Sequence, residues 1–252
     1  SPALHNAWLR AAGIDAAYLA LDVAPEDGPQ LMDAVRTLGL AGANLTVPHK
    51  QVVVPHLDAI DDDVRAIGAA NTIVRSERGY TGHNTDAQGF VRSFEAEHGA
   101  TLSGRRVLLL GAGGASVAVA KGLLDAGVDR IDVVNRTVSR ASALADRLSP
   151  KIHAHPLERA TALGRGADLV VNALAGAGIP AAESVDPKLL AANAVWCDLN
   201  YWMDSPPGLL RCRQSGIAFL DGHGMLYHQA ALAFTHLTGM SPPDVTPSGQ
   251  VE

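Results

Sequence analysis

The sequence predicts an α/β protein that contains an N-terminal α/β unit and a C-terminal unit with a doubly wound parallel sheet. Three observations support this fold class. Extended and helical patterns alternate along the chain, which is typical of mixed or parallel sheets. From Leu102 onward the alternation becomes a regular succession of buried apolar strands and helices. The length of 252 residues suits one large domain or two modest ones.

The first third of the chain alternates helices and strands. Residues 2–12 form a predicted helix, because Ser1 precedes Pro2 in the manner of a cap before the first helical position. A fold rarely begins on such a cap, so we expect a further strand upstream of Ser1. The elements that follow are predicted as a strand over 16–23, a helix over 29–39, a strand over 42–48, a helical stretch over 52–68 and a hairpin over 71–86.

A more regular pattern starts near Leu102. Residues 105–127 contain a buried apolar strand, a glycine-rich turn and an alanine-rich helix. The later elements are predicted as strands over 130–137, 167–174 and 194–201, a helix over 138–148 and a last helix over 225–239. The tail from Met240 is rich in proline and is predicted to fray. We expect the boundary between the two units to lie between Asp86 and Ser103.

The composition argues against several functional classes. The 26 acidic residues outnumber the 20 basic ones, whereas nucleic-acid binding usually needs a basic face. No apolar run reaches the roughly 18 residues that a membrane span requires. Cys197 and Cys212 form no CxxC pair, no signal peptide is evident, and the histidines show no metal-ligand spacing. We therefore expect a cytoplasmic protein that binds a small molecule and holds no metal.

The stretch GAGGAS, residues 111–116, follows an apolar strand and opens a helix. Gly111 and Gly113 fit the first two glycines of a dinucleotide-binding loop, where they permit a tight turn and close approach of a pyrophosphate. The helix N-terminus adds bare N–H groups and a partial positive charge. Ser116 occupies the third glycine position, so a glycine-rich turn without a ligand is the alternative. The flanking strand and helix favour the binding loop of a Rossmann-like unit.

The next predicted strand ends in NRTVSR. A site for NAD usually has an acidic residue at this address, which binds the ribose 2′-hydroxyl. This chain instead has Asn135, Arg136, Thr137 and, one turn later, Arg140. A guanidinium can bind a 2′-phosphate in fork geometry, whereas a carboxylate would repel it. The pattern predicts NADP as the cofactor, and the alternative is that Arg136 is a solvated charge at a strand end.

Polar residues gather at predicted strand ends in the N-terminal half. They are Thr46, Lys50, Asn71, Asn84 and Asp86. Small ligands bind where strand ends face the crevice of an α/β protein. Lys50 and Asp86 could form a pair that gives a proton to, or takes it from, a hydroxyl that is being oxidised. Taken singly, each residue fits a surface, turn or helix-cap role, so only their convergence argues for function.

Seven blocks of sequence carry a resemblance to a known family. They are SPALHN, NLTVPHK, GAANTIV, GHNTDAQG, GAGGAS, NRTVSRA and DGHGMLYHQAALAF. In this order they resemble the shikimate dehydrogenases over essentially the whole chain. The resemblance implies the reversible, NADP-dependent reduction of 3-dehydroshikimate to shikimate, a step in aromatic amino-acid biosynthesis. It also implies a substrate-binding and catalytic domain over 1–86, an NADP domain over 87–222, and a last helix, about 223–252, that packs back on the first domain.

The resemblance also assigns roles to single residues. Lys50 matches the family's catalytic lysine, Asp86 matches its partner aspartate, and Ser1 matches the second serine of a Ser-x-Ser motif that holds the substrate carboxylate. Further substrate contacts are implied for Thr46, Asn71, Tyr201 and Gln229. Cofactor contacts are implied for the pyrophosphate loop (Gly111, Ala112, Gly113, Gly114, Ala115), for the 2′-phosphate segment (Asn135, Arg136, Thr137, Arg140) and for three lesser positions (Asp62, Leu199, Gly222).

The chain departs from the family pattern at three places. Residues 172–178 have alanines where a Thr or Ser and a Met are usual, residues 201–207 replace a proline-centred loop, and Val117 replaces a frequent arginine. In the family both loops flank the nicotinamide. Three alternative functions remain: a dehydrogenase for quinate or an amino analogue of shikimate, a catalytically silent NADP-sensing module, and an unrelated NADP-binding enzyme. Family members occur as monomers and homodimers, and the sequence does not decide between them.

Overall fold

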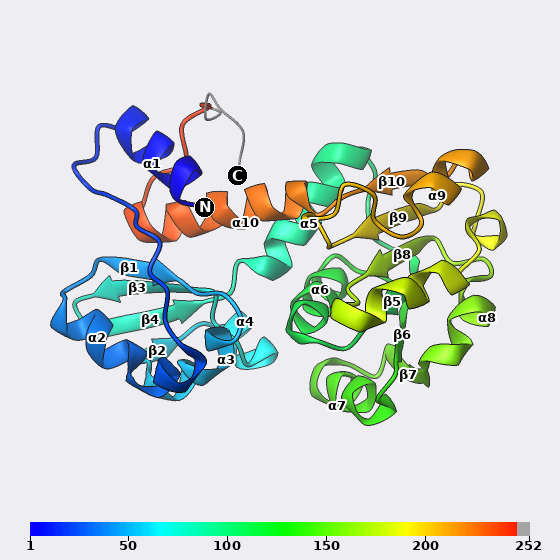
Figure 1. The fold of residues 1–252 in the computed structure, drawn as a ribbon, viewed down its shortest axis with the longest axis horizontal. Helices are drawn as coiled ribbons and strands as arrows, with labels where there is room; N and C mark the ends of the chain where they lie inside the picture. The colour runs from blue at the N-terminus through cyan, green and yellow to red at the C-terminus, as the bar shows by residue number, and fades with distance from the viewer. Residues whose placement is uncertain (246–252) are drawn as a thin grey trace. The chain divides into compact units, whose positions relative to one another are not determined.

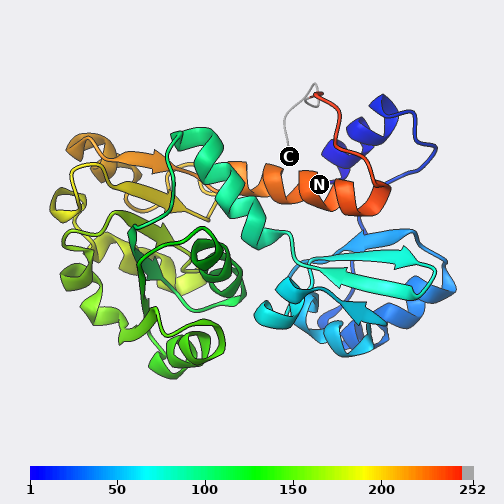
Figure 2. The same cartoon turned by 180° about the vertical axis from the view of Figure 1, so that it is seen from behind.

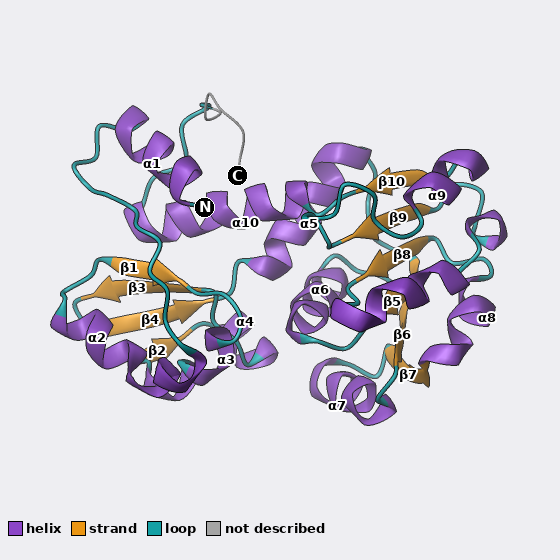
Figure 3. Ribbon diagram, in the orientation of Figure 1, coloured by secondary structure: helices purple, strands orange, loops and turns teal. Residues whose placement is uncertain are grey.

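The computed structural model of the protein describes residues 1–245, and its elements are drawn in Figure 1 and coloured by type in Figure 3. The chain divides into two compact units. Unit 1 comprises Ser1–Thr85 and the chain from Tyr227 onward, and unit 2 comprises Asp86–Leu226. Of the tail that was predicted to fray, residues 246–252 lie outside the described residues. Residues 240–245 form neither helix nor strand.

Unit 1 is built on a mixed sheet of four strands in the order β1-β3-β4-β2. The strand β3 (Thr72–Ser76) is antiparallel to β1 (Gly42–Asn44) and to β4 (Gly79–His83), and β2 (Ala59–Ile60) runs parallel to β4. The predicted hairpin over 71–86 is confirmed as the β3–β4 pair. This pairing brings both ends of the hairpin, at residues 71 and 84, to the same end of the two central strands.

The helices of unit 1 cover this sheet and extend beyond it. They are α1 (Pro2–Ala11), α2 (Leu31–Thr37), α3 (His49–Val52), α4 (Asp62–Ile67) and the part of α10 (His223–Thr238) that starts at Tyr227, with 3₁₀ turns η1 (Pro25–Gln30) and η2 (Val54–His56). The start of α4 is fixed by Asp61, whose Oδ1 accepts from the N–H of Val64 at 2.7 Å.

The last helix packs back on the first unit, as the resemblance implied. Trp8 and Leu9 of α1 form one buried apolar cluster with Ala230 and Phe234 of α10. The Trp8 and Phe234 rings meet edge to face at a centroid distance of 5.5 Å. Figure 2 shows α1 beside this part of α10 from the opposite side.

Two predictions for unit 1 are wrong. No strand forms over 16–23 among the described residues, and Leu19 and Leu21 remain 71% and 65% exposed. A β pattern becomes a strand only when a neighbouring backbone pairs with it. The helical stretch over 52–68 is broken, because the N–H of Asp58 bonds to the carbonyl of Tyr80 at 3.0 Å and so begins the pairing of β2 with β4.

Unit 2 contains a parallel sheet of six strands in the order β10-β9-β8-β5-β6-β7. This is the doubly wound order in which the chain starts at the centre and winds first to one edge and then to the other. The predicted fold class is therefore confirmed. The strands are β5 (Arg106–Leu110), β6 (Arg130–Asn135), β7 (Ile152–Pro156), β8 (Leu169–Asn172), β9 (Val195–Asp198) and β10 (Ala218–Leu220).

Each face of this sheet is covered by its own helices. Alternate residues of β5 enter opposite clusters: Val107 and Leu109 pack with α5 (Asp86–His98), α6 (Gly114–Asp125) and α7 (Val138–Leu148), whereas Leu108 and Leu110 pack with α8 (Ala160–Gly164) and α9 (Leu209–Ser215). The 3₁₀ turns are η3 (Leu157–Arg159), η4 (Gly176–Ser184) and η5 (Pro187–Leu189). Over residues 1–245, no helix is both long enough and apolar enough to cross a membrane.

Candidate functional site

The strand order of unit 2 defines where a ligand binds. The winding reverses at β5, which lies between β6 and β8 at the centre of the sheet. In open α/β sheets ligands bind at the carboxyl ends of the strands beside this reversal. Gly111 follows β5 directly and Asn172 ends β8. The glycine-rich loop and the loop 172–178, the first of the two unusual loops that depart from the family pattern, therefore start at this point.

The glycine-rich loop has the geometry of a dinucleotide cradle. Gly111 has a φ of 106°, and a Cβ on it would lie 3.0 Å from the carbonyl oxygen of Ala173, so a glycine is required there. Gly113 and Gly114 are exposed, and a Cβ on either would meet no atom within 4 Å. Buried Ser116 replaces the third glycine, and its Oγ accepts from the N–H of Gly113 at 3.2 Å. The loop thus leaves room for a pyrophosphate above the N-terminus of α6.

The end of β6 presents positive charge to solvent. Nδ2 of Asn135 donates to the carbonyl of Thr137 at 2.9 Å and so fixes the turn into α7. Arg136 and Arg140 are exposed, and within the part of the chain that the structure describes neither guanidinium has a protein partner. Two guanidinium groups next to the cradle suit the 2′-phosphate of NADP.

A buried polar network of Asn172, Asp198 and Asn200 holds the starts of the two unusual loops, residues 172–178 and 201–207. Oδ2 of Asp198 accepts from Nδ2 of Asn172 at 2.7 Å, and Oδ1 accepts from Nδ2 and from the backbone N–H of Asn200 at 2.7 and 3.0 Å. All three side chains are almost completely buried. Asp198 and Asn200 were not predicted from the sequence as site residues. The available signal was a carboxylate that directly follows the apolar strand residues VWC.

Leu199 and Gly222, two predicted cofactor positions, lie side by side. A Cβ on Gly222 would lie 2.9 Å from the carbonyl oxygen of Leu199, so the two backbones touch. The N–H of Leu199 donates to the carbonyl of Asn172 at 2.9 Å. These contacts place both residues next to the buried network at the carboxyl ends of β8 and β9.

Tyr201 lies on the wall of a cavity of about 360 Å³ within unit 2. Tyr201 is 40% exposed, and its ring lies 5.9 Å from the ring of His223. Other residues on the wall are Met203, Asp204, Pro206, Arg213, Phe219 and Asp221. The second unusual loop, residues 201–207, therefore shapes this cavity.

In unit 1, Lys50 is held next to the start of β3. The N–H of His49 donates to the carbonyl of Thr46 at 2.9 Å and closes a tight turn around the cis peptide of Val47–Pro48. The carbonyl of Lys50 accepts from the N–H of Ala70 at 2.8 Å. Lys50 is half-buried and Thr46 is exposed. The neighbouring His49 is buried, and its Nε2 forms a hydrogen bond with the carbonyl of Val23 at 2.9 Å. Its role is therefore structural.

Asn71 and Gln229 are brought together, although one precedes β3 and the other lies in α10. Nδ2 of Asn71 donates to Oε1 of Gln229 at 3.5 Å and to Oγ1 of Thr85 at 2.9 Å. The N–H of Thr85 donates to Oδ1 of Asn71 at 2.9 Å. Buried Asn84 serves the fold by donating to the carbonyl of Ala69 at 2.8 Å.

The remaining predicted residues belong to both units. Asp86 is the first residue of α5, is 8% exposed, and belongs to unit 2. Ser1 is exposed ahead of α1, and its side chain makes no capping hydrogen bond. The carboxylate of Asp62 is 98% exposed and forms an ion pair with Arg65 at 3.2 Å. No cluster of three or more His, Cys, Asp or Glu side chains suited to a metal occurs among residues 1–245.

The comparisons with known proteins agree over both units. Residues 1–73 match the family model described as the shikimate dehydrogenase substrate binding domain, and residues 94–189 match that of shikimate / quinate 5-dehydrogenase. The chain is 38% identical over 245 residues to the shikimate dehydrogenase (NADP(+)) of Rhizobium rhizogenes, covering 96% of this chain and 86% of that protein.

Two solved structures are similar along the same span. One is shikimate 5-dehydrogenase of Thermus thermophilus in complex with NADP(H) and shikimate, at 35% identity and a TM-score of 0.79, covering 96% of this chain and 89% of that one. The other is quinate dehydrogenase of Corynebacterium glutamicum in complex with NAD, at 32% identity and a TM-score of 0.83, covering 96% and 90%.

Proposed function

The chain belongs to the shikimate dehydrogenase family, and on this premise we propose that it catalyses the reversible, NADP-dependent reduction of 3-dehydroshikimate to shikimate. The observation that carries the proposal is the cradle of Gly111–Ala115 at the reversal of the sheet, with two exposed guanidinium groups beside it. Unit 1 would bind the substrate and unit 2 the cofactor. We expect the enzyme to work in the cytoplasm, as a monomer or a homodimer.

The residues present fit NADP. Gly113 and Gly114 leave open space for the pyrophosphate, and Arg136 and Arg140 offer unpartnered positive charge for the 2′-phosphate in the described part of the chain. The pair Leu199–Gly222 and the loops held by Asp198 would line the nicotinamide side. When bound, the reduced cofactor supplies a hydride.

In unit 1, Lys50 would act as the general acid. Its ammonium would donate a proton to the ketone oxygen as that oxygen gains negative charge, and its positive charge would stabilise the developing alkoxide. Asp86 would orient this ammonium and bond a substrate hydroxyl. The amide groups of Asn71 and Gln229 and the hydroxyl of Thr46 would bind ring hydroxyls or the carboxylate. Ser1 and Tyr201 would bind the carboxylate.

One other substrate, quinate, and one other class of function, an NADP-sensing module, are distinguished from the proposed activity by a single assay. Oxidation or reduction of the nicotinamide is followed by absorbance with 3-dehydroshikimate and NADPH, then with shikimate or quinate and NADP or NAD. We expect turnover with 3-dehydroshikimate and NADPH, and weak turnover with NAD, because Arg136 stands at the address of the usual acidic residue. Turnover with quinate alone would identify a quinate enzyme. Silence with every pair would support the NADP-sensing module.

A further inference from the structure

A chain of side-chain hydrogen bonds runs through unit 1 from a tyrosine to the predicted substrate amides. The hydroxyl of Tyr18 donates to Oδ1 of Asn44 at 2.8 Å. Nδ2 of Asn44 donates to Oγ1 of Thr72 at 2.9 Å, and that hydroxyl donates to Oδ1 of Asn71 at 3.0 Å. Asn71 then donates to Gln229. We call the chain Tyr18–Asn44–Thr72–Asn71 the relay.

In both amides of the relay, Asn71 and Asn44, a neighbouring backbone group determines which way Oδ1 and Nδ2 point. The N–H of Thr85 can only donate, so Oδ1 of Asn71 must face it, and Nδ2 must point to Gln229. The carbonyl of Asn71 can only accept, and it lies 3.3 Å from Nδ2 of Asn44. Oδ1 of Asn44 therefore faces Tyr18, which has to act as a donor. Removing the phenol would leave this oxygen without the donor that holds it.

Tyr18 is itself held in place by α1. Nδ2 of Asn6 donates to the carbonyl of Tyr18 and Oδ1 of Asn6 accepts from its N–H, both at 2.8 Å. The ring of His5 stacks on the Tyr18 ring at 4.3 Å with an interplanar angle of 12°. Burial raises the pKa of Tyr18 to about 12, so the phenol keeps its proton at neutral pH. The donor at the head of the relay is thus fixed in position and in protonation state.

We propose that Tyr18 is a positioning residue for substrate binding, whose hydroxyl holds the side chain of Asn44 in place and, through Thr72, supports the Asn71–Gln229 amide pair. The inference rests on the proposed function, in which these amides contact the substrate. The relay lies wholly within unit 1, whereas the cofactor cradle lies in unit 2. Loss of the hydroxyl should therefore affect substrate binding selectively.

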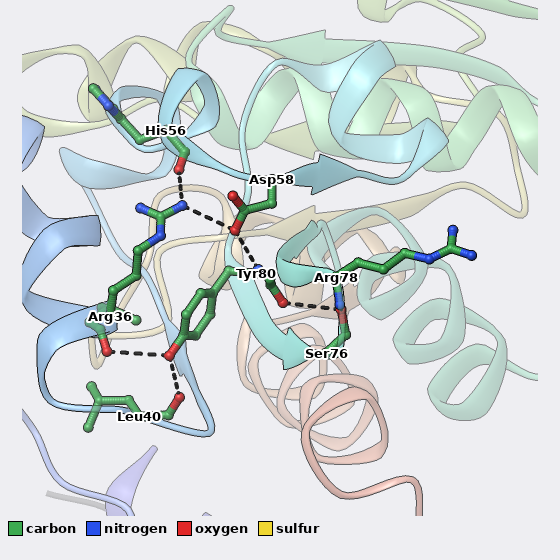
Figure 4. Close-up of polar contacts among 9 residues, drawn as sticks. Arg36, Leu40, His56, Asp58, Ser76, Arg78 and Tyr80 are labelled. Carbon is green, nitrogen blue, oxygen red and sulfur yellow. Dashed lines mark hydrogen bonds and ion pairs between the residues drawn. The ribbon is translucent and has the colours of Figure 1, made fainter.

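The test compares two tyrosine-to-phenylalanine variants. Tyr80 is a buried tyrosine of the same unit, but its hydroxyl donates to the carbonyls of Leu40 and Val35 at 2.7 and 3.3 Å, outside the relay (Figure 4). Tyr18→Phe should raise KM for shikimate about three- to tenfold, as expected for one hydrogen bond, and leave KM for NADP within about twofold. Tyr80→Phe should leave both constants within about twofold.

A second pair of variants tests the path of the relay. Thr72→Val removes the bridging hydroxyl and should raise KM for shikimate about as much as Tyr18→Phe does, whereas Thr72→Ser should recover most of that loss. The double variant Tyr18→Phe/Thr72→Val should show less than the product of the two single effects, since both break one network. Thermal unfolding checks that each variant is folded.

The outcomes separate the two hypotheses. If the wild-type protein turns over shikimate and Tyr18→Phe behaves like Tyr80→Phe, the relay has no role in binding while the proposed function stands. If Tyr18→Phe raises both KM values equally, the effect is a general loss of structure and the inference is overturned. If the wild-type protein has no turnover and calorimetry shows no binding of shikimate, the proposed function fails and the inference fails with it.

Discussion

Nδ2 of Asn71 lies 3.5 Å from Oε1 of Gln229, although 158 positions of sequence separate the two residues. The contact exists because α10 packs its apolar residues against α1, which returns the end of the chain to unit 1. The fold thus brings a residue that precedes β3 and a residue of the last helix together as one amide pair.

Gln229→Glu tests whether this amide pair contacts the substrate. The change keeps an oxygen for Asn71 but introduces a negative charge, which would repel the carboxylate of the substrate. We expect KM for shikimate to rise about tenfold or more and KM for NADP to stay constant. Gln214→Glu, at an exposed position of α9, is the matched control. An unaltered KM for shikimate in the first variant would remove Gln229 from the substrate site.

Lys50→Ala tests the general acid. We expect kcat to fall by about 10²–10⁴ with a smaller change in KM, because general acid catalysis contributes in this range. The control is Lys188→Ala, which removes an exposed lysine from η5 of unit 2. Steady-state kinetics at saturating NADPH measure both effects. Full retention of kcat in Lys50→Ala would show that this lysine has no chemical role.

Arg136→Gln tests cofactor selectivity. We expect KM for NADPH to rise about tenfold to a hundredfold, the range for losing a hydrogen bond to a charged group, while the weak reaction with NADH does not change. Arg78→Gln is the control, since Arg78 is an exposed arginine in the turn of the β3–β4 hairpin (Figure 4). An equal loss with NADPH and NADH would mean that Arg136 does not recognise the 2′-phosphate.

Asp198→Asn tests the buried network. Both carboxylate oxygens accept hydrogen bonds, so an amide NH₂ at either position would face an existing donor. We expect the free energy of unfolding to fall by about 1–3 kcal/mol and KM for NADPH to rise. Urea unfolding measures the first effect, and Asp146→Asn, at an exposed position of α7, controls for the loss of charge. If unfolding is unaffected, the network does not stabilise these loops.

His5→Phe tests a pH effect on stability. Burial lowers the pKa of His5 to about 4, whereas an unfolded histidine has a pKa of about 6.5. Between these values the unfolded state binds more protons, so the stability that His5 contributes is complete above about pH 6.5 and is lost as the pH falls toward 4.

The phenylalanine variant keeps a ring that can stack on Tyr18 but cannot be protonated. Unfolding temperatures measured from pH 7 to pH 4.5 should therefore fall less for His5→Phe than for the wild-type protein. Other groups titrate in both proteins, so the difference between the two curves is the relevant quantity. Parallel curves would contradict the assigned shift of His5.

Much of unit 2 could be predicted because its signals are local. The apolar run of β5, the turn at Gly111 and the alanine-rich α6 are adjacent in the chain, and their order alone indicates a dinucleotide unit. The strand β7 was missed because its sequence, IHAHP, is broken by two histidines and a proline, which is tolerated at the edge of the sheet. The edge strand β10 and the short helix α9 were missed because each is brief.

The sequence alone determined which chemical groups are available: glycines that fit a pyrophosphate, arginines where NAD would need an acid, and a lysine after the turn at Pro48. Each of these is a property of a few neighbouring residues. The tertiary structure decided which groups meet, including Asn71 with Gln229, Tyr18 with Asn44, and Asp198 with two asparagines. Hydrogen bonds depend on distance and direction in space, and for residues far apart in the chain neither is encoded in the local sequence pattern.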